Sequence, residues 1–199
     1  MRHLTARTAA AALAFAAVVA LAGCAPSAKP AATPGATGTG TPAAVATPTP
    51  TPTPTLPPTP VTLTCDQVVT PDQLQAAEPS FAAVQDYAPK AGTLEKRIAD
   101  WQGATCAWRN ASTGAVIEIA IARPPKDRLE GLKNDAITVA HPVPTYGTPP
   151  IEGYFKPGTS GQVQIFRGSY WVVAESTAFF EPGDPAPLMQ DVLANIPTD

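Results

Sequence analysis

The clearest pattern in this chain is a strict alternation of apolar and other residues between positions 115 and 123. The alternate positions on one side carry the isoleucines Ile117, Ile119 and Ile121. Glu118 and two alanines fall on the other side. A period of two over this length predicts a strand with one buried face. Together with the segment 105–109 it predicts a hairpin that turns across residues 110–114.

A second hairpin is predicted for the segments 162–167 and 170–177. Gly168 and Ser169 separate them, and glycine in the first position of a two-residue loop is typical of a type II′ turn. A loop of this length sets the register of the two strands. The expected pairs are Arg167 with Tyr170, Phe166 with Trp171, and Ile165 with Val172.

Three segments have the spacing and the terminal residues of helices. The Thr-Pro-Asp-Gln sequence at 70–73 combines an N-cap threonine, a proline in the first turn and a glutamine that can complete a capping box. We expect helical turns to continue through residues 80–87. A further helix is predicted at 126–137, and a last one after a cap formed by Asp184.

The order of these elements is helix, two strands, helix, two strands, helix. Sequential hairpins pair antiparallel, so the predicted fold is α+β, with one sheet of four to five strands and helices over one face. Residues 154–155 supply the short fifth strand, and the proline-rich segment 139–152 is expected to be an irregular loop. The chain then consists of two αββ-like halves followed by a C-terminal helix.

The first residues of the chain resemble an export signal. A basic start with Arg2 and Arg7 is followed by a short Ala/Val/Leu-rich segment and then by small residues. The segment Leu-Ala-Gly-Cys that ends at Cys24 resembles the lipobox of bacterial lipoproteins. This resemblance implies that residues 1–23 are cleaved and that the Cys24 thiol receives a diacylglyceryl group. The alternative is an uncleaved membrane anchor, but a span needs about 20 apolar residues and this segment has about 14.

Residues 24–62 are predicted to form a stalk between the lipidated cysteine and a single folded domain at 63–199. The segment is nearly all Ala, Thr, Pro and Gly, with strict Thr-Pro alternation at 47–54. Proline lacks an amide donor, so we expect an extended polyproline-like chain with a reach of about 100 Å. The stalk is either a plain spacer or a site of O-glycosylation.

Charge and cysteine content limit the partners of the domain. All sixteen acidic residues lie from Asp66 onward, together with ten of the thirteen basic ones, which gives the domain a net charge of −6. Without a cluster of Lys and Arg, nucleic-acid binding is not expected. If Cys24 carries lipid, Cys65 and Cys106 remain, and in an oxidising compartment they are expected to form a disulfide. A metal or redox pair is the alternative, although no Cys-x-x-Cys is present.

Few residues suggest catalysis. His141 is the only histidine after the signal segment and lies in a proline-rich loop. No spacing of His and Cys predicts a metal site, and no cofactor is expected. Glu118 and Glu175 lie on strands, on faces opposite the main apolar rows. Such a pair could hydrolyse a glycoside if the two carboxyl groups were close together. Otherwise each is an outward residue paired with Arg or Lys.

Aromatic side chains are the other candidates for a site. The four residues of the candidate binding patch are Tyr146, Tyr154, Phe166 and Trp171. Phe166 and Trp171 are expected to face one another on the sheet face away from the helices. They form either an exposed patch that binds a ligand, or a second small core covered by the loops 139–152 and 178–187.

The folded region resembles a broad group of small actinobacterial lipoproteins of unknown function. The resemblance depends on Cys65, on Cys106 and Trp108 two residues later, and on the final hairpin and helix. It implies a surface-exposed accessory or sensing domain and supplies no catalytic residues. Trp108 is expected to pack near the disulfide.

These observations favour a non-enzymatic binding or sensing module, anchored by lipid at the extracytoplasmic face of the cell membrane. Its partner would be an envelope protein, a glycan or a small hydrophobic ligand. One alternative is a small hydrolase of the cell wall that uses carboxylates. Another is a solute-binding accessory of a transporter. Such proteins usually have two lobes, and a domain of about 137 residues is too short to form both.

Overall fold

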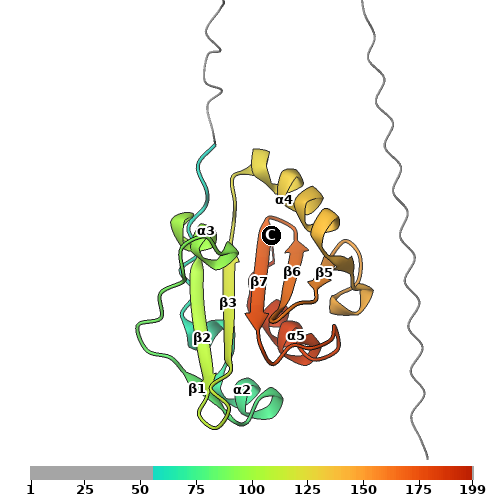
Figure 1. The fold of residues 1–199 in the computed structure, drawn as a ribbon. Helices are drawn as coiled ribbons and strands as arrows, with labels where there is room; N and C mark the ends of the chain where they lie inside the picture. Colours follow the sequence, from blue (N-terminus) through green and yellow to red (C-terminus); the bar gives the residue numbers. More distant parts are fainter. Residues whose placement is uncertain (1–55, 199) are drawn as a thin grey trace, which may run out of the picture. The chain divides into compact units, whose positions relative to one another are not determined.

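Seven strands form one antiparallel sheet in the part of the chain described by the computed structural model, residues 56–198 (Figure 1). The predicted signal segment, Cys24 and most of the stalk lie outside the described residues. The strands are β1 (Phe81–Ala83), β2 (Ala104–Asn110), β3 (Val116–Ala122), β4 (His141–Pro142), β5 (Glu152–Lys156), β6 (Gly161–Arg167) and β7 (Tyr170–Ser176). Their order across the sheet is β1-β2-β3-β7-β6-β5-β4. The predicted α+β class is therefore confirmed, but the predicted count of four to five strands is too low.

Both predicted hairpins are present. In the second one the register is the expected one, with Arg167 opposite Tyr170 and Phe166 opposite Trp171. Gly168 in the turn has a φ of 55°, a value that glycine adopts without steric cost. The two hairpins meet in the middle of the sheet, where β3 pairs with β7.

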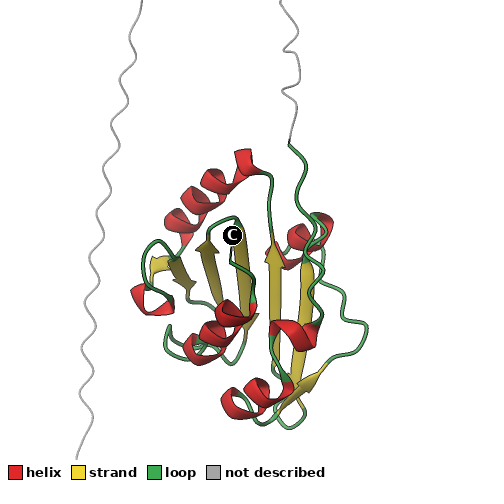
Figure 2. Cartoon of the chain, turned by 180° about the vertical axis from the view of Figure 1, so that it is seen from behind, coloured by secondary structure: helices red, strands yellow, loops and turns green. Residues whose placement is uncertain are grey.

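Helices cover both faces of the sheet (Figures 1 and 2). They are α1 (Cys65–Val68), α2 (Pro71–Ala77), α3 (Leu94–Asp100), α4 (Lys126–Val139), the 3-10 helix η1 (Pro144–Tyr146) and α5 (Ala186–Asn195). The face that carries Ile119 packs against α1, α2 and α5. The opposite face, which carries Ala120, packs against α3 and α4. The predicted arrangement with helices on one face is therefore wrong.

The second layer of helices was missed because alternation in β3 marks only its isoleucine side as apolar. Ala120 and Ala122 on the other side are small but completely buried. Small residues let a helix approach closely: a Cβ atom added to Gly103, just after α3, would lie 2.5 Å from the carbonyl oxygen of Ile121. Alanine and glycine therefore provide the space that α3 occupies.

Two other local predictions are wrong. Residues 80–87 contain the strand β1 and not a helix, because Phe81 to Ala83 pair with the edge of β2. Asp184 does not cap α5, whose first turn receives no side-chain hydrogen bond. Its carboxylate instead accepts hydrogen bonds from the amides of Phe180 and Glu181 and shapes the preceding loop. The capping box at Thr70 and Gln73 is confirmed.

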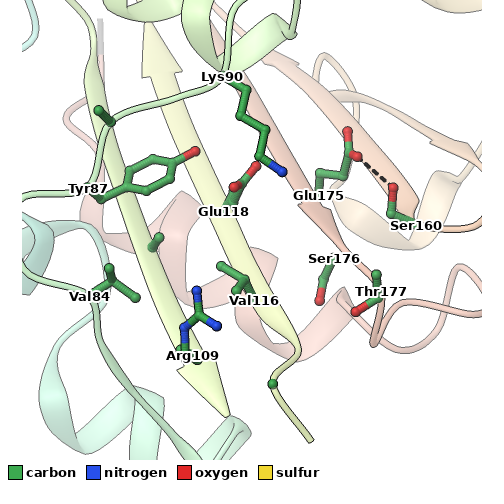
Figure 3. A pocket seen from close by; sticks show the side chains of 13 residues that line it. Val84, Tyr87, Lys90, Arg109, Val116, Glu118, Ser160, Glu175, Ser176 and Thr177 are labelled. Carbon is green, nitrogen blue, oxygen red and sulfur yellow. Dashed lines mark hydrogen bonds between the residues drawn. The ribbon is translucent and has the colours of Figure 1, made fainter. Parts of the chain in front are cut away.

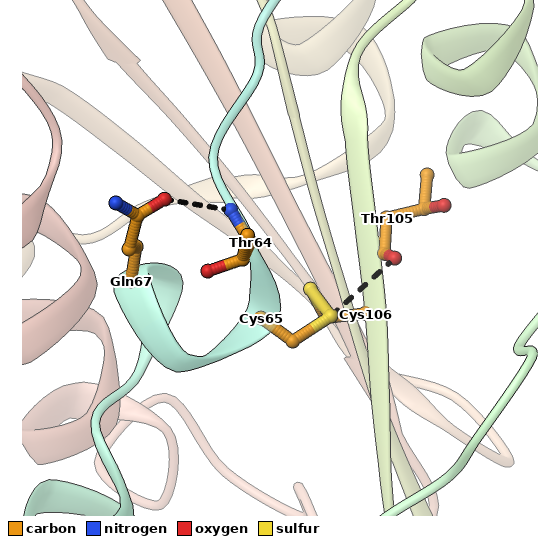
Figure 4. The surroundings of a disulfide bond; sticks show 5 residues. All are labelled: Thr64, Cys65, Gln67, Thr105 and Cys106. Atoms are coloured by element: carbon orange, nitrogen blue, oxygen red, sulfur yellow. Dashed lines mark hydrogen bonds between the residues drawn. A yellow bond between two sulfur atoms is a disulfide. The ribbon is translucent and has the colours of Figure 1, made fainter.

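The disulfide between Cys65 and Cys106 is present, as predicted, and joins α1 to β2 (Figure 4). Trp108 belongs to the same buried cluster as Cys106. Backbone contacts begin before residue 63: Thr59 bridges to Arg123, and the amide of Val61 donates to the carbonyl oxygen of Gln102. The last residues of the predicted stalk are thus part of the folded domain.

Candidate functional site

A row of mostly polar side chains crosses the sheet on the face that α3 and α4 cover only in part. In this row Ala107 of β2 is paired with Glu118 of β3, and Glu118 with Glu175 of β7. Glu175 is in turn paired with Gln162 of β6. Side chains at paired positions point to the same face, so both glutamates lie side by side there. The next row along the strands, which contains Ala120 and Val173, belongs to the apolar core.

A groove of about 440 Å³ lies over this polar row (Figure 3). Its walls include Tyr87 and Lys90 from the loop between β1 and α3, Arg109 from β2, and Ser160 from the turn before β6. The Tyr87 hydroxyl and the Lys90 ammonium both point toward Glu118 in Figure 3. The groove is in the lower part of the size range of small-molecule sites.

Glu175 is held in place by two neutral donors. The Ser160 hydroxyl donates to one of its carboxylate oxygens at 2.5 Å, and the side-chain amide of Gln162 donates to the other at 2.8 Å. Both donors lie on the β6 side of the groove. The carboxylate of Glu175 is therefore oriented before any ligand arrives.

A third glutamate, Glu95, lies next to this pair. It occupies the first turn of α3 and is completely buried, and neither of its carboxylate oxygens has a hydrogen-bond partner. Burial is the main cause that raises the pKa of Glu95. Its own amide lowers it, the charges of Glu175 and Glu118 raise it further, and the nearby Thr93 hydroxyl lowers it slightly. An ionised carboxylate without partners is costly in such a place, so the neutral form is favoured.

Tyr87 responds to the same charges. Its hydroxyl oxygen is buried and has no hydrogen-bond partner. Burial raises the pKa of Tyr87. The negative charges of Glu118 and then Glu95 raise it further, as does the closeness of the hydroxyl to the Glu118 carboxylate. The hydroxyl thus remains protonated and faces a region of negative potential.

The four aromatic residues of the predicted binding patch do not form an exposed surface. Trp171 and Phe166 are fully buried, with nearly parallel rings whose centroids are 6.3 Å apart. Tyr154 packs edge-on against Phe166, and Tyr146 lies in the other core. The prediction of an exposed patch is therefore wrong, and the interpretation as a second core is correct. This core is covered by helices α3 and α4 instead of the predicted loops.

Of the other candidates, the structure places His141 apart from the groove and the two strand glutamates in it. His141 is exposed on the edge strand β4. Glu118 and Glu175, predicted either as a carboxylate pair or as separate outward residues, lie at directly paired positions. Neither forms an ion pair with an Arg or Lys of residues 56–198. The expectation that each has a basic partner is wrong.

Sequence reasoning missed Glu95 and Tyr87. Tyr87 was assigned to a helix, and Glu95 lies in a helix that was not predicted. The threonine before α3 was an available signal: the Thr93 hydroxyl accepts a hydrogen bond from the amide of Lys96, which is an N-cap contact. Burial of Glu95 had no local signal.

Within residues 56–198, no group of three or more His, Cys, Asp or Glu side chains has the arrangement of a metal site. In the same range no helix is long and apolar enough to cross a membrane. Comparisons with protein-family models, with curated proteins and with solved structures found no match for this chain. Assignment of a function therefore depends on the geometry of the groove.

Proposed function

We propose that this protein is a lipid-anchored binding module at the extracytoplasmic face of the membrane, and that its ligand occupies the groove over Glu118 and Glu175. The observation that carries the binding role is the groove itself. It is open, and its polar groups are positioned by strand pairing and by hydrogen bonds from Ser160 and Gln162. Rigid elements that hold polar groups around a hollow are characteristic of binding sites.

The anchor is supported by the signal-like N-terminus and by Cys24. In the host bacterium, membrane-extracted protein is expected to begin at Cys24 and to carry the mass of a diacylglyceryl group. A Cys24→Ala variant should lose that mass and leave the membrane fraction. An unmodified Met1 terminus on the membrane-extracted protein would contradict the anchor.

The groove is tested by amide chemical shifts in oxidised protein labelled with nitrogen-15. The probes are putrescine, butanediol, succinate and N-acetylglucosamine, which differ in charge and hydroxyl content. At least one of them is expected to shift the amides of Ala107, Glu118 and Glu175 and to leave Asn195, on the opposite side of the sheet, unchanged. If no probe shifts the groove amides, the proposed binding role fails.

A second candidate function is favoured by the direct pairing of Glu118 with Glu175. Side chains at paired positions are about 5 Å apart at Cβ, which is compatible with the carboxyl separation of a retaining glycosidase. Turnover of cell-wall glycan that is lost in Glu118→Gln and in Glu175→Gln, with unchanged melting temperatures, would establish the hydrolase. Absence of turnover in the wild-type protein would exclude this activity for the tested glycan.

A further inference from the structure

We propose that the ligand of this groove carries a positively charged organic group, an ammonium or a guanidinium, which binds between Glu118 and Glu175. This inference rests on the proposed binding role of the groove and names the chemistry of its ligand. Its first support is the pairing of two carboxylates at directly opposite positions of adjacent strands. Like charges in such pairs destabilise a sheet unless a cation lies between or beside them.

The second support is that neither groove glutamate is engaged in an ion pair, although two basic residues lie in the groove wall. Glu175 has only neutral donors, and in residues 56–198 no ion pair joins Glu95, Glu118 or Glu175 to a basic side chain. The two basic residues in the groove wall, Lys90 and Arg109, are exposed. A bound cation would supply the missing partner.

The third support is a third carboxyl group, Glu95 of α3, which lies on the same face of the sheet as the groove pair. Glu95 is 0% exposed and its carboxylate oxygens have no hydrogen-bond partner, and the charges of Glu175 and Glu118 add to the burial that raises its pKa. A buried carboxyl group without a partner is uncommon, because it forfeits its hydration. Placed beside the two groove glutamates, it increases the negative potential there whenever it ionises. A cationic ligand would favour that ionised form.

Lys90 partly shields the groove glutamates (Figure 3). Its ammonium group reaches over the groove toward Glu118 without forming an ion pair (Figure 3). It comes from the loop between β1 and α3 and is exposed, so a ligand can displace it at small cost. We therefore expect Lys90 to compete with the ligand for the same carboxylates.

The size of the groove and the arrangement of its carboxylates favour an organic cation over a metal ion. The three glutamates do not have the arrangement of a metal site. The volume of about 440 Å³ can hold a small molecule with one or two charged groups. The ring of Tyr87 lines the wall and offers an aromatic surface to a weakly hydrated cation.

The test is calorimetric titration of the oxidised full-length protein with matched probes. Putrescine carries two charges on four carbons, while butanediol and succinate have the same length with neutral and negative ends. Choline adds a quaternary ammonium. We expect putrescine or choline to bind, with an affinity that falls as salt is added, and we expect butanediol and succinate not to bind.

Variants localise the effect. Glu118→Gln and Glu175→Gln should each weaken binding by about tenfold or more, because each removes a charged hydrogen-bond acceptor. Glu181→Gln removes the same charge from an exposed loop position and should leave the affinity unchanged. Lys90→Gln should tighten binding by about two- to fivefold, whereas Lys126→Gln on α4 should not.

Several results would overturn the inference. Equal binding of butanediol and putrescine would show that charge is not recognised. Groove shifts with N-acetylglucosamine alone would refute the cationic ligand and leave the proposed binding role intact, while no shifts with any probe would refute both. Calcium binding that competes with putrescine would assign the groove to a metal ion. An equal loss in Glu181→Gln would show only a general effect of net charge.

Discussion

At the scale of single residues, the molecule is distinguished by what surrounds its glutamates. Glu118 and Glu175 face one another in the groove, and Glu95 is buried beside them. By contrast, Glu152 accepts from the Tyr154 hydroxyl and pairs with Lys133 at 2.8 Å. The hydrogen bond from Lys133 is the main cause that lowers the pKa of Glu152, whereas burial raises that of Glu95. The same residue type thus has opposite behaviour in two places.

Glu95→Gln is expected to change how stability depends on pH. Because the folded pKa lies above the ordinary value of 4.5, the native state holds this proton more tightly than the unfolded chain. The contribution of Glu95 to stability is therefore greatest below pH 4.5 and is lost as pH rises through the folded pKa. Each pH unit by which the folded pKa exceeds the unfolded pKa corresponds to about 1.4 kcal/mol of folding free energy.

Thermal melts of the variant and the wild-type protein between about pH 4 and pH 8 test this prediction. The melting temperature of Glu95→Gln, relative to wild type, should rise with pH over this interval. Glu181→Gln, which alters an exposed carboxylate, should show no such trend. A difference in melting temperature between Glu95→Gln and wild type that does not change with pH would contradict a raised pKa of Glu95.

At the scale of elements, two glycines near the helices on the groove side have different roles. Gly103 follows α3, where an added Cβ would lie 2.5 Å from both a backbone oxygen and the Ile98 side chain. Gly131 lies in the exposed part of α4, and an added Cβ would meet nothing within 4 Å. One glycine is required by packing, and the other only weakens its helix.

Alanine substitutions at these positions should therefore have opposite signs. Gly131→Ala is expected to stabilise the protein by up to about 1 kcal/mol through helix propensity. Gly103→Ala is expected to destabilise it by about 1–3 kcal/mol, because α3 must move away from β3. Denaturant unfolding measures both, and a neutral Gly103→Ala would show that α3 is not closely packed on the sheet.

The strand pattern was predictable to a large extent because its signals are local. The register of the second hairpin follows from its two-residue turn and agrees with the predicted one. The helix α3 was not predicted, since its seven residues carry only two buried side chains, Glu95 and Ile98. Edge strands β1 and β4 are three and two residues long, too short for a periodic signal.

At the scale of the whole molecule, the disulfide joins the start of the folded chain to the sheet. Cys65 and Cys106 are 41 residues apart in sequence. Closing such a loop stabilises a domain by about 4 kcal/mol in the chain-entropy description. The double variant Cys65→Ser, Cys106→Ser should lose about this much, as measured by denaturant unfolding.

Reductant provides the control for this prediction. It should lower the melting temperature of the wild-type protein toward that of the double variant and leave the double variant unchanged. A wild-type melting temperature that is insensitive to full reduction would contradict a stabilising role for the disulfide.

The sequence by itself determined the α+β class, both hairpins, the register of the second one and the pairing of Cys65 with Cys106. The strands and turns depend on alternation and turn residues, which are visible locally, and the disulfide depends on the count of cysteines in the chain. The tertiary structure alone decided that helices cover both faces, that Trp171 is buried, and that Glu118 and Glu175 meet. The meeting of those glutamates depends on pairing between β3 and β7, strands from different hairpins. The physical reason is that such long-range register arises from packing of the whole core, which no short segment encodes.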